Sequence, residues 1–332
     1  MMYTSYDNIG LLKVLKFLKS HKDDFLSGQD LSDVLKISRV AVWKHIKTIK
    51  SLGYKIESKQ KLGYRLVKNS EKLLPWEITD NLKTKTIGRK VYYFDIIDST
   101  QNFAMEIATK KNENGSIVIA QKQTSGRGRM NRKWVTGKGG VSLSIILHPK
   151  FDVSISTLFP IAASVALVNA IQNTLKINPN VKWPNDIVIK GKKVAGMIVD
   201  STIESNLIEN MILGVGINFK VDTKNLESKL KDTENFYGVS SLLKTTNNLT
   251  SLELVQNFLF ELEKVLTLLN NGKTSQIIQR WEKSSTTIGK RVSIKTNDGI
   301  VTGIAKKINN DGSLNIIKNG KIQKVIAGDV SI

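Results

Sequence analysis

The chain has 332 residues, of which 50 are Lys or Arg and 29 are Asp or Glu, giving a formal net charge of +21. This length suits two or three domains, and the excess of cations favours polyanionic partners. The absence of cysteine excludes disulfides, thiolate metal sites and a cysteine nucleophile, and His21, His45 and His148 are too scattered for zinc-ligand spacing. We therefore predict no protein-bound metal site.

The hydropathy pattern predicts a cytoplasmic protein with no membrane partner. The longest apolar stretch, near residues 158–168, is shorter than the roughly 20 residues that a membrane-spanning helix needs. No charged-apolar-small signal peptide opens the chain.

Residues 1–68 are predicted to form a winged helix-turn-helix domain. Apolar residues recur at helical spacing near the start, a second helix begins near Ser27, and Ser38 is a candidate N-cap for a third. From 36 to 50 there is no acid, and residues 54–66 resemble a two-stranded ribbon. The alternative is a three-helix protein-interaction domain with a solvated basic face. The predicted DNA contacts are Ser38, Arg39, Lys44 and Lys47.

Residues 69–283 are predicted to form an α+β domain with a mixed sheet, because strand patterns alternate with helical ones. Neither a Walker loop nor a G-x-G-x-x-G that follows a strand and opens a helix is present, so a P-loop or Rossmann site is not predicted. The expected strands are 91–96, 116–121, 141–147, 187–189, 194–199 and 211–217, and the expected helices are 100–109, 158–175 and two within 251–283.

Five short motifs lie in the central domain. Each has a structural explanation, such as a helix cap, a basic surface loop, a turn or a strand glycine. The glycine-arginine loop also has the chemistry to hold anions, because arginine binds two oxygens at once and glycine lets main chain approach a ligand. The motifs are Asp98-Ser99-Thr100, Gly126 to Trp134 (GRGRMNRKW), Lys182 to Asp186 (KWPND), Lys193 to Gly196 (KVAG) and Gly214 to Asn218 (GVGIN).

In this order, the five motifs resemble those of the biotin protein ligases, also called biotin-[acetyl-CoA-carboxylase] ligases, over about residues 91–218. The basic N-terminal domain resembles that of the bifunctional members, which also repress transcription of biotin genes. The resemblance implies a class II synthetase-like catalytic domain. It also implies an SH3-like β-barrel over residues 284–332, where Asn-Asp-Gly turns at 297–299 and 310–312 and an Asn-Gly turn at 319–320 separate alternating apolar residues.

The resemblance implies that biotin and ATP form biotinyl-5'-AMP and pyrophosphate, and that biotin then passes to a lysine of a biotin carboxyl carrier protein. Mg²⁺ is expected to bridge ATP oxygens, and the other expected partners are operator DNA and, in the adenylate-bound state, a second copy of the chain. The implied catalytic residues are Lys193, Arg127, Arg129 and Asp186. Those implied for biotin are Ser99, Thr100, Gln101, Gln123, Arg127, Gly128, Arg129, Lys193 and Gly196, and those for the nucleotide are Arg129, Arg132, Trp134, Lys182, Asn185 and Asn218.

Two positions depart from the family pattern. Asn131 stands where glycine is frequent, in a loop for which a positive φ is expected, and asparagine tolerates that conformation. Gln101 follows Ser-Thr where asparagine is frequent, with Asn102 next, so either amide could face the ligand. Two other functions stay open. One is a lipoate or octanoate ligase, which shares the acyl-adenylate chemistry, and the other is a metabolite-sensing transcription factor with an inactive ligase domain.

Overall fold

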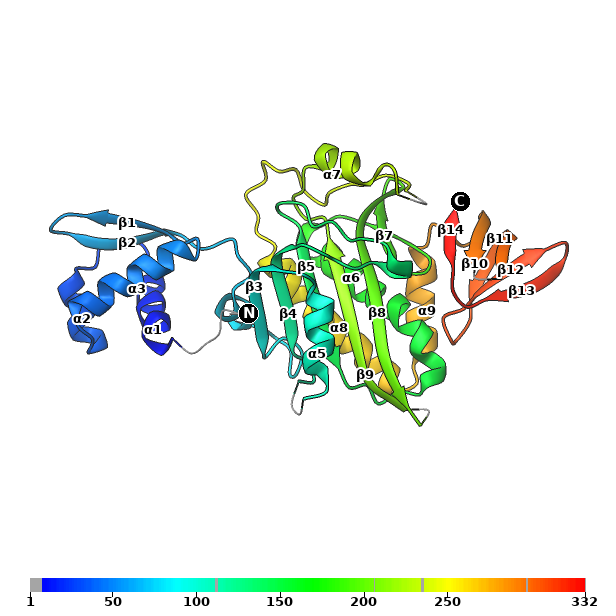
Figure 1. Ribbon diagram of the computed structural model, residues 1–332, viewed down its shortest axis with the longest axis horizontal. Coiled ribbons are helices and arrows are strands. Elements are labelled where there is room, and N and C mark those ends of the chain that lie inside the picture. Colours follow the sequence, from blue (N-terminus) through cyan, green and yellow to red (C-terminus); the bar gives the residue numbers. More distant parts are fainter. Residues whose placement is uncertain (1–7, 111–112, 206, 234–235, 297, 332) are drawn as a thin grey trace. The chain divides into compact units, whose positions relative to one another are not determined.

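A computed structural model describes residues 8–110, 113–205, 207–233, 236–296 and 298–331. The chain divides into two compact units, Met1–Asp80 and Asn81–Ile332, whose elements are labelled in Figure 1. The finer division into three domains at residues 68 and 283 stays a prediction.

The first unit is a winged helix-turn-helix, as predicted. Three helices, α1 (Ile9–Ser20), α2 (Gly28–Leu35) and α3 (Arg39–Ser51), precede the hairpin of β1 (Lys55–Lys59) and β2 (Gly63–Lys68). The predicted cap of α3 is present, because Ser38 Oγ accepts a hydrogen bond from the Ala41 amide at 3.2 Å. The helix buries one apolar side against the unit's core through Val42, Ile46 and Ile49.

A short helix, α4 (Pro75–Thr79), closes the first unit through a buried carboxylate. Glu77 accepts a hydrogen bond from the Tyr54 hydroxyl and forms an ion pair with Lys19 Nζ at 2.6 Å. Trp76 Nε1 donates to the same Tyr54 hydroxyl at 2.7 Å. The residues that precede the second unit are thereby fixed to the helix-turn-helix.

The second unit is built on a mixed seven-stranded sheet in the order β3-β4-β5-β9-β8-β7-β6. The β3–β4 pair is parallel and the other pairs are antiparallel. The six predicted strands are confirmed, and the three-residue β6 was not predicted. The bounds are β3 (Val91–Ile97), β4 (Ile117–Gln123), β5 (Val141–Leu147), β6 (Asn180–Lys182), β7 (Asp186–Ile189), β8 (Lys192–Glu204) and β9 (Leu207–Ile217).

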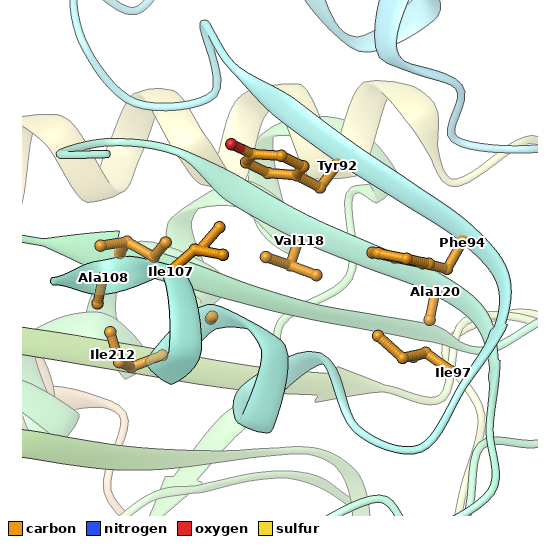
Figure 2. Close-up of a cluster of buried hydrophobic side chains, with 10 residues drawn as sticks. Tyr92, Phe94, Ile97, Ile107, Ala108, Val118, Ala120 and Ile212 are labelled. Carbon is orange, nitrogen blue, oxygen red and sulfur yellow. The ribbon is translucent and has the colours of Figure 1, made fainter. Parts of the chain in front are cut away.

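Helices cover both faces of this sheet (Figure 1). On one face lies α5 (Thr100–Ala108), and Figure 2 shows the apolar cluster beneath it, in which Tyr92, Phe94 and Val118 of the sheet meet Ile107. On the other face α6 (Phe159–Leu175) packs against α8 (Leu252–Asn270) and α9 (Thr274–Lys283). Two short 3₁₀ helices, η1 (Arg129–Asn131) and η2 (Val153–Leu158), and α7 (Thr223–Leu230) complete the helices that the described residues form.

One helical segment corrects an expectation from the sequence. Residues Val153–Leu175 form a helical stretch of 23 residues whose most apolar 18-residue window has a mean hydropathy of 1.7, long and apolar enough to cross a membrane by length and composition. The prediction that no stretch reaches this length was wrong. In the protein 67% of its most apolar window is buried, and α6 packs against α8. Its apolar composition is that of a central core helix.

The last strands form an antiparallel five-stranded sheet in the order β13-β12-β11-β10-β14, which corresponds to the predicted C-terminal β domain. The predicted turns at 310–312 and 319–320 are present, with positive φ at Gly312, Asn319 and Gly320. The turn predicted at 297–299 includes Asn297, which lies outside the described residues. The strands are β10 (Arg291–Thr296), β11 (Gly299–Ile308), β12 (Leu314–Lys318), β13 (Lys321–Val325) and β14 (Asp329–Ser331).

Candidate ligand-binding site

A single cavity in the second unit is lined by residues of all five motifs. Every residue for which the resemblance implied a role in catalysis or in biotin or nucleotide binding lines it. The lining carries six cations and two carboxylates, so the cavity suits an anionic ligand. Sequence reasoning missed several lining residues, among them Ser142, Ser144, Tyr237 and Asp329.

The glycine-arginine segment is an ordered hairpin. The Trp134 amide donates to the Gly126 carbonyl at 2.8 Å, and the Gly128 amide donates to the Arg132 carbonyl at 2.7 Å. A Cβ at Gly126 would lie 2.4 Å from the Trp134 carbonyl oxygen, so this close approach requires glycine. The positive φ expected at Asn131 falls instead one residue earlier, at Met130 (φ 52). The left-handed residue at the tip turns the chain back on itself.

Each of the three arginines of this hairpin contacts an oxygen of another side chain. Arg129 donates to Asn185 Oδ1 at 3.1 Å, and burial lowers the pKa of Arg129. Arg132 forms a 2.6 Å ion pair with Asp329 of β14. Arg127, which is more exposed, lies 3.1 Å from Asp200 Oδ2. The cations are therefore fixed in position along the cavity wall.

At the α5 end of the cavity, side-chain amides and hydroxyls form a network. Gln123 Oε1 accepts hydrogen bonds from the Thr100 amide at 2.8 Å and from the Thr100 hydroxyl at 3.0 Å. Ser144 Oγ lies 2.9 Å from both Thr100 Oγ1 and Gln101 Oε1. Gln101 is buried and lines the cavity, whereas Asn102 is exposed and donates to Asp98. Of the two amides, Gln101 is the one at the cavity.

Three buried polar atoms that face this cavity have no hydrogen-bond partner among the described residues: Ser99 Oγ, Trp134 Nε1 and Asp186 Oδ1. Ser99 occupies the N-cap position of α5 but makes no side-chain cap bond, so the simple capping explanation fails. Buried polar groups are nearly always hydrogen-bonded in folded proteins. Of these, Ser99 Oγ and Trp134 Nε1 indicate where a polar ligand binds, whereas Asp186 Oδ1 lies beside the Lys193 ammonium.

The antiparallel pairing of β7 with β8 brings Lys193 to Asp186. Lys193 Nζ lies 2.6 Å from Asp186 Oδ1, close enough for an ion pair, although the direction is not that of a hydrogen bond. Asp186 pairs with Gly196 across the strands, and a Cβ at Gly196 would lie 2.7 Å from Lys193 Cε. The K-V-A-G motif therefore needs its glycine to leave room for the lysine side chain.

The indole of Trp134 lies against β9. A Cβ at Gly216 would lie 2.1 Å from Trp134 Cε2, so the indole can pack against this strand only because residue 216 of the G-V-G-I-N motif is glycine. Lys193 Nζ lies 5.8 Å from the centre of this ring. Lys182 is buried nearby, and burial lowers its pKa. This part of the cavity combines a flat apolar surface with cations, a combination that suits a nucleotide.

The outer face of α3 presents the residues predicted to contact DNA. Ser38, Arg39, Lys44 and Lys47 are all exposed, and Ser38 also caps the helix. Two apolar side chains of α3 that the sequence analysis did not single out are also exposed: Val40 is 63% exposed and Trp43 is 54% exposed. Exposed apolar groups on a basic helix are suited to thymine methyl groups in a major groove.

Comparisons with known proteins agree with the fold. Residues 93–218 match the biotin/lipoate A/B protein ligase family, 11–65 match an HTH domain, and 287–332 match the biotin protein ligase C terminal domain. The chain is 34% identical to the bifunctional ligase/repressor BirA of Bacillus subtilis (strain 168), over 93% of this chain and 94% of that protein. It is 26% identical to BirA of Escherichia coli (strain K12), over 98% of each.

Among solved structures, the biotin protein ligase from Aquifex aeolicus in complex with biotin and ATP shares the fold. Its TM-score is 0.62 at 22% identity, over 73% of this chain and 98% of that one. Fold and site together define a biotin/lipoate-type protein ligase joined to a helix-turn-helix domain. More narrowly, the chain belongs to the family of bifunctional biotin ligase/repressors.

Proposed function

We infer that this chain activates biotin with ATP to form biotinyl-5'-AMP, transfers biotin to a lysine of a biotin carboxyl carrier protein, and represses transcription by binding operator DNA. The observation that carries the enzymatic part is the cavity itself, which six cations line together with two buried polar atoms, Ser99 Oγ and Trp134 Nε1, that have no hydrogen-bond partner in the described chain. Family membership supports the same reaction and the DNA-binding role.

In the first half-reaction a carboxylate oxygen of biotin bonds to the α-phosphorus of ATP, and the bond from that phosphorus to the bridging oxygen breaks to release pyrophosphate. Two anions must meet, so fixed cations lower the barrier. We assign Lys193 and Arg129 to the meeting point, Arg127 to biotin's carboxylate side and Arg132 to the departing pyrophosphate. Mg²⁺ carried by ATP would supply further charge neutralisation.

Recognition of the two substrates is assigned to opposite ends of the cavity. The free hydroxyl of Ser99 and the network of Thr100, Gln101 and Gln123 would hold biotin's ureido head. The indole of Trp134, with Lys182, Asn185 and Asn218, would hold the adenylate. Gly128 and Gly196 are also assigned to biotin, because both line the cavity without a side chain that would occupy it.

In the second half-reaction the acceptor lysine's neutral amine attacks the acyl carbon, AMP leaves with the bonding electron pair, and the amine loses a proton. We assign Asp186 as the acceptor of that proton: its Oδ1 receives no hydrogen bond from the described chain, and it forms an ion pair with Lys193 at 2.6 Å.

The ligase reaction is tested by biotin-dependent exchange of labelled pyrophosphate into ATP, followed by mass spectrometry of a carrier domain. We expect exchange only with biotin, and a mass increase on a single lysine. Lipoate or octanoate that drove exchange as well as biotin would favour the lipoate ligase. DNA binding with biotin but no exchange would favour the metabolite-sensing transcription factor.

The repressor role is tested by mobility shifts on DNA upstream of biotin genes. We propose that adenylate formation tightens binding and that a homodimer forms in that state, because one recognition helix reads one half-site. A cytoplasmic location follows from this role, since operator DNA lies there. Binding that did not weaken with salt would contradict phosphate contacts by Arg39, Lys44 and Lys47.

A further inference from the structure

Tyr237 lines the cavity, although no motif predicted it. Its hydroxyl donates a hydrogen bond to Asp186 Oδ2 at 2.6 Å. The face of its ring lies 3.5 Å from Lys182 Nζ. Burial and the neighbouring carboxylate raise the pKa of Tyr237, so the hydroxyl keeps its proton at neutral pH and acts as a donor.

Asp186 links Tyr237 to Lys193. One carboxylate oxygen receives the Tyr237 hydroxyl, and the other lies 2.6 Å from Lys193 Nζ. A carboxylate held at one oxygen by a fixed donor loses its freedom to rotate about χ2. The second oxygen therefore stays directed at the lysine, whose ammonium group is kept over Gly196.

The segment that carries Tyr237 also holds the main chain of Lys193. The Lys193 amide donates to the Gly238 carbonyl at 3.1 Å, and the Ser240 amide donates to the Lys193 carbonyl at 2.8 Å. The segment is itself anchored by Val239, which packs in an apolar cluster with Val221 and Leu226. Residues 237–240 thus position Lys193 twice, directly at its backbone and through Asp186 at its side chain.

We propose that Tyr237 is a positioning residue for adenylate formation: acting through Asp186, its hydroxyl holds the Lys193 ammonium at the point where biotin's carboxylate meets the α-phosphate. Its ring confines Lys182 beside the same point. No proton moves through Tyr237, because formation of the new O–P bond and departure of pyrophosphate require no proton transfer. This inference rests on the proposed ligase function.

The test compares Tyr237→Phe, which keeps the ring and removes the hydroxyl, with the native chain in single-turnover formation of biotinyl-5'-AMP. We expect the rate constant to fall about 10-fold, as for loss of a hydrogen bond to a charged group, with the KM for biotin unchanged within about twofold. The matched control is Tyr93→Phe, because the Tyr93 hydroxyl donates to Asp95 Oδ1 at 2.9 Å outside the cavity. That variant should adenylate at the native rate.

Two further variants separate positioning from a general structural effect. Tyr237→Phe in an Asp186→Asn background should cause no additional loss, because the hydroxyl acts through that carboxylate. Tyr237→Leu, which also removes the ring, should raise the KM for ATP above that of Tyr237→Phe, since Lys182 loses its ring contact. Thermal unfolding of each variant checks that it is folded.

The outcomes distinguish this inference from the function on which it rests. A native chain without biotin-dependent exchange would overturn the proposed function. Two results in a native chain that does form adenylate would overturn the positioning role alone. One is a Tyr237→Phe variant that adenylates as fast as Tyr93→Phe, and the other is a loss from Tyr237→Phe that adds fully to the loss from Asp186→Asn.

Discussion

Two glycines of β9, Gly214 and Gly216, allow the two ends of the cavity to be perturbed separately. They lie two residues apart in a strand, so both face the cavity. A Cβ at Gly216 would lie 2.1 and 2.3 Å from two carbons of the Trp134 indole. A Cβ at Gly214 would lie 2.5 Å from Gln101 Oε1 and 2.8 Å from Ile198 Cγ1. Gly216→Ala should therefore disturb the nucleotide end and Gly214→Ala the biotin end.

The expected loss of ATP affinity in Gly216→Ala follows from how closely the new Cβ would approach the Trp134 indole. Ordinary carbon contacts begin near 3.4 Å, so at Gly216 the indole has to move by more than an ångström. Overpacking of this kind costs about 1–3 kcal/mol. If that cost appears as lost ligand binding, the Kd for ATP rises about 5- to 150-fold, because each 1.4 kcal/mol is tenfold.

Isothermal titration calorimetry with biotin and with a non-hydrolysable ATP analogue measures the two ends separately. We expect Gly216→Ala to weaken the nucleotide with biotin nearly unchanged, and Gly214→Ala to show the reverse. Gly28→Ala is the control, since its nearest neighbour, Tyr64 Cε2, would lie 3.8 Å from the new Cβ. If both cavity variants weakened the same ligand equally, the division of the cavity into a biotin end and an adenylate end would be wrong.

Three other substitutions test the site and the fold. Ser99→Ala should weaken biotin about 10-fold without lowering the Tm of the free chain, because the hydroxyl is buried and unbonded in the described structure; unchanged affinity in calorimetry would remove Ser99 from the biotin site. Lys47→Ala should reduce the slope of log affinity against log salt by about 1 in mobility shifts, and an unchanged slope would place Lys47 away from phosphate. Glu77→Ala should destabilise the first unit by about 3 kcal/mol in urea unfolding, because Lys19 and Tyr54 lose a buried carboxylate. The exposed Lys68–Glu71 pair supplies the control, since Glu71→Ala should cost less than about 1 kcal/mol; equal losses would refute the role of burial.

The parts of the fold that sequence predicted best have strong local signals. The bounds of β5 match the prediction, because the run VSLSIIL is buried along its whole length. The start of α3 was predictable because Ser38 is a good N-cap before an apolar face. By contrast β6 has three residues and ends at a buried lysine, Lys182, so no periodicity can reveal it.

The site shows the same division between local and long-range information. Residues inside compact motifs were found because their chemistry and spacing are visible in a few letters. Tyr237 meets Asp186 from 51 residues away, Asp200 meets Gln101 from 99, and Asp329 meets Arg132 from 197. Each contact exists only because the sheet and the C-terminal strands bring distant segments together, so no local pattern could predict it.

The pairing of Arg132 with Asp329 changes how the glycine-arginine strip is understood. From the sequence, this segment could be a basic surface loop; in the structure it is a hairpin whose arginines already have acceptors. A guanidinium has five N–H donors in a plane, so a carboxylate on one edge orients the group and leaves the other edge for a phosphate. Cations held in this way need little reorganisation when charge develops between substrates, and that is the condition under which fixed charge lowers a barrier most. The C-terminal sheet therefore contributes to the cavity wall through β14, because Asp329 fixes Arg132, a cation that the central domain's own motif supplies.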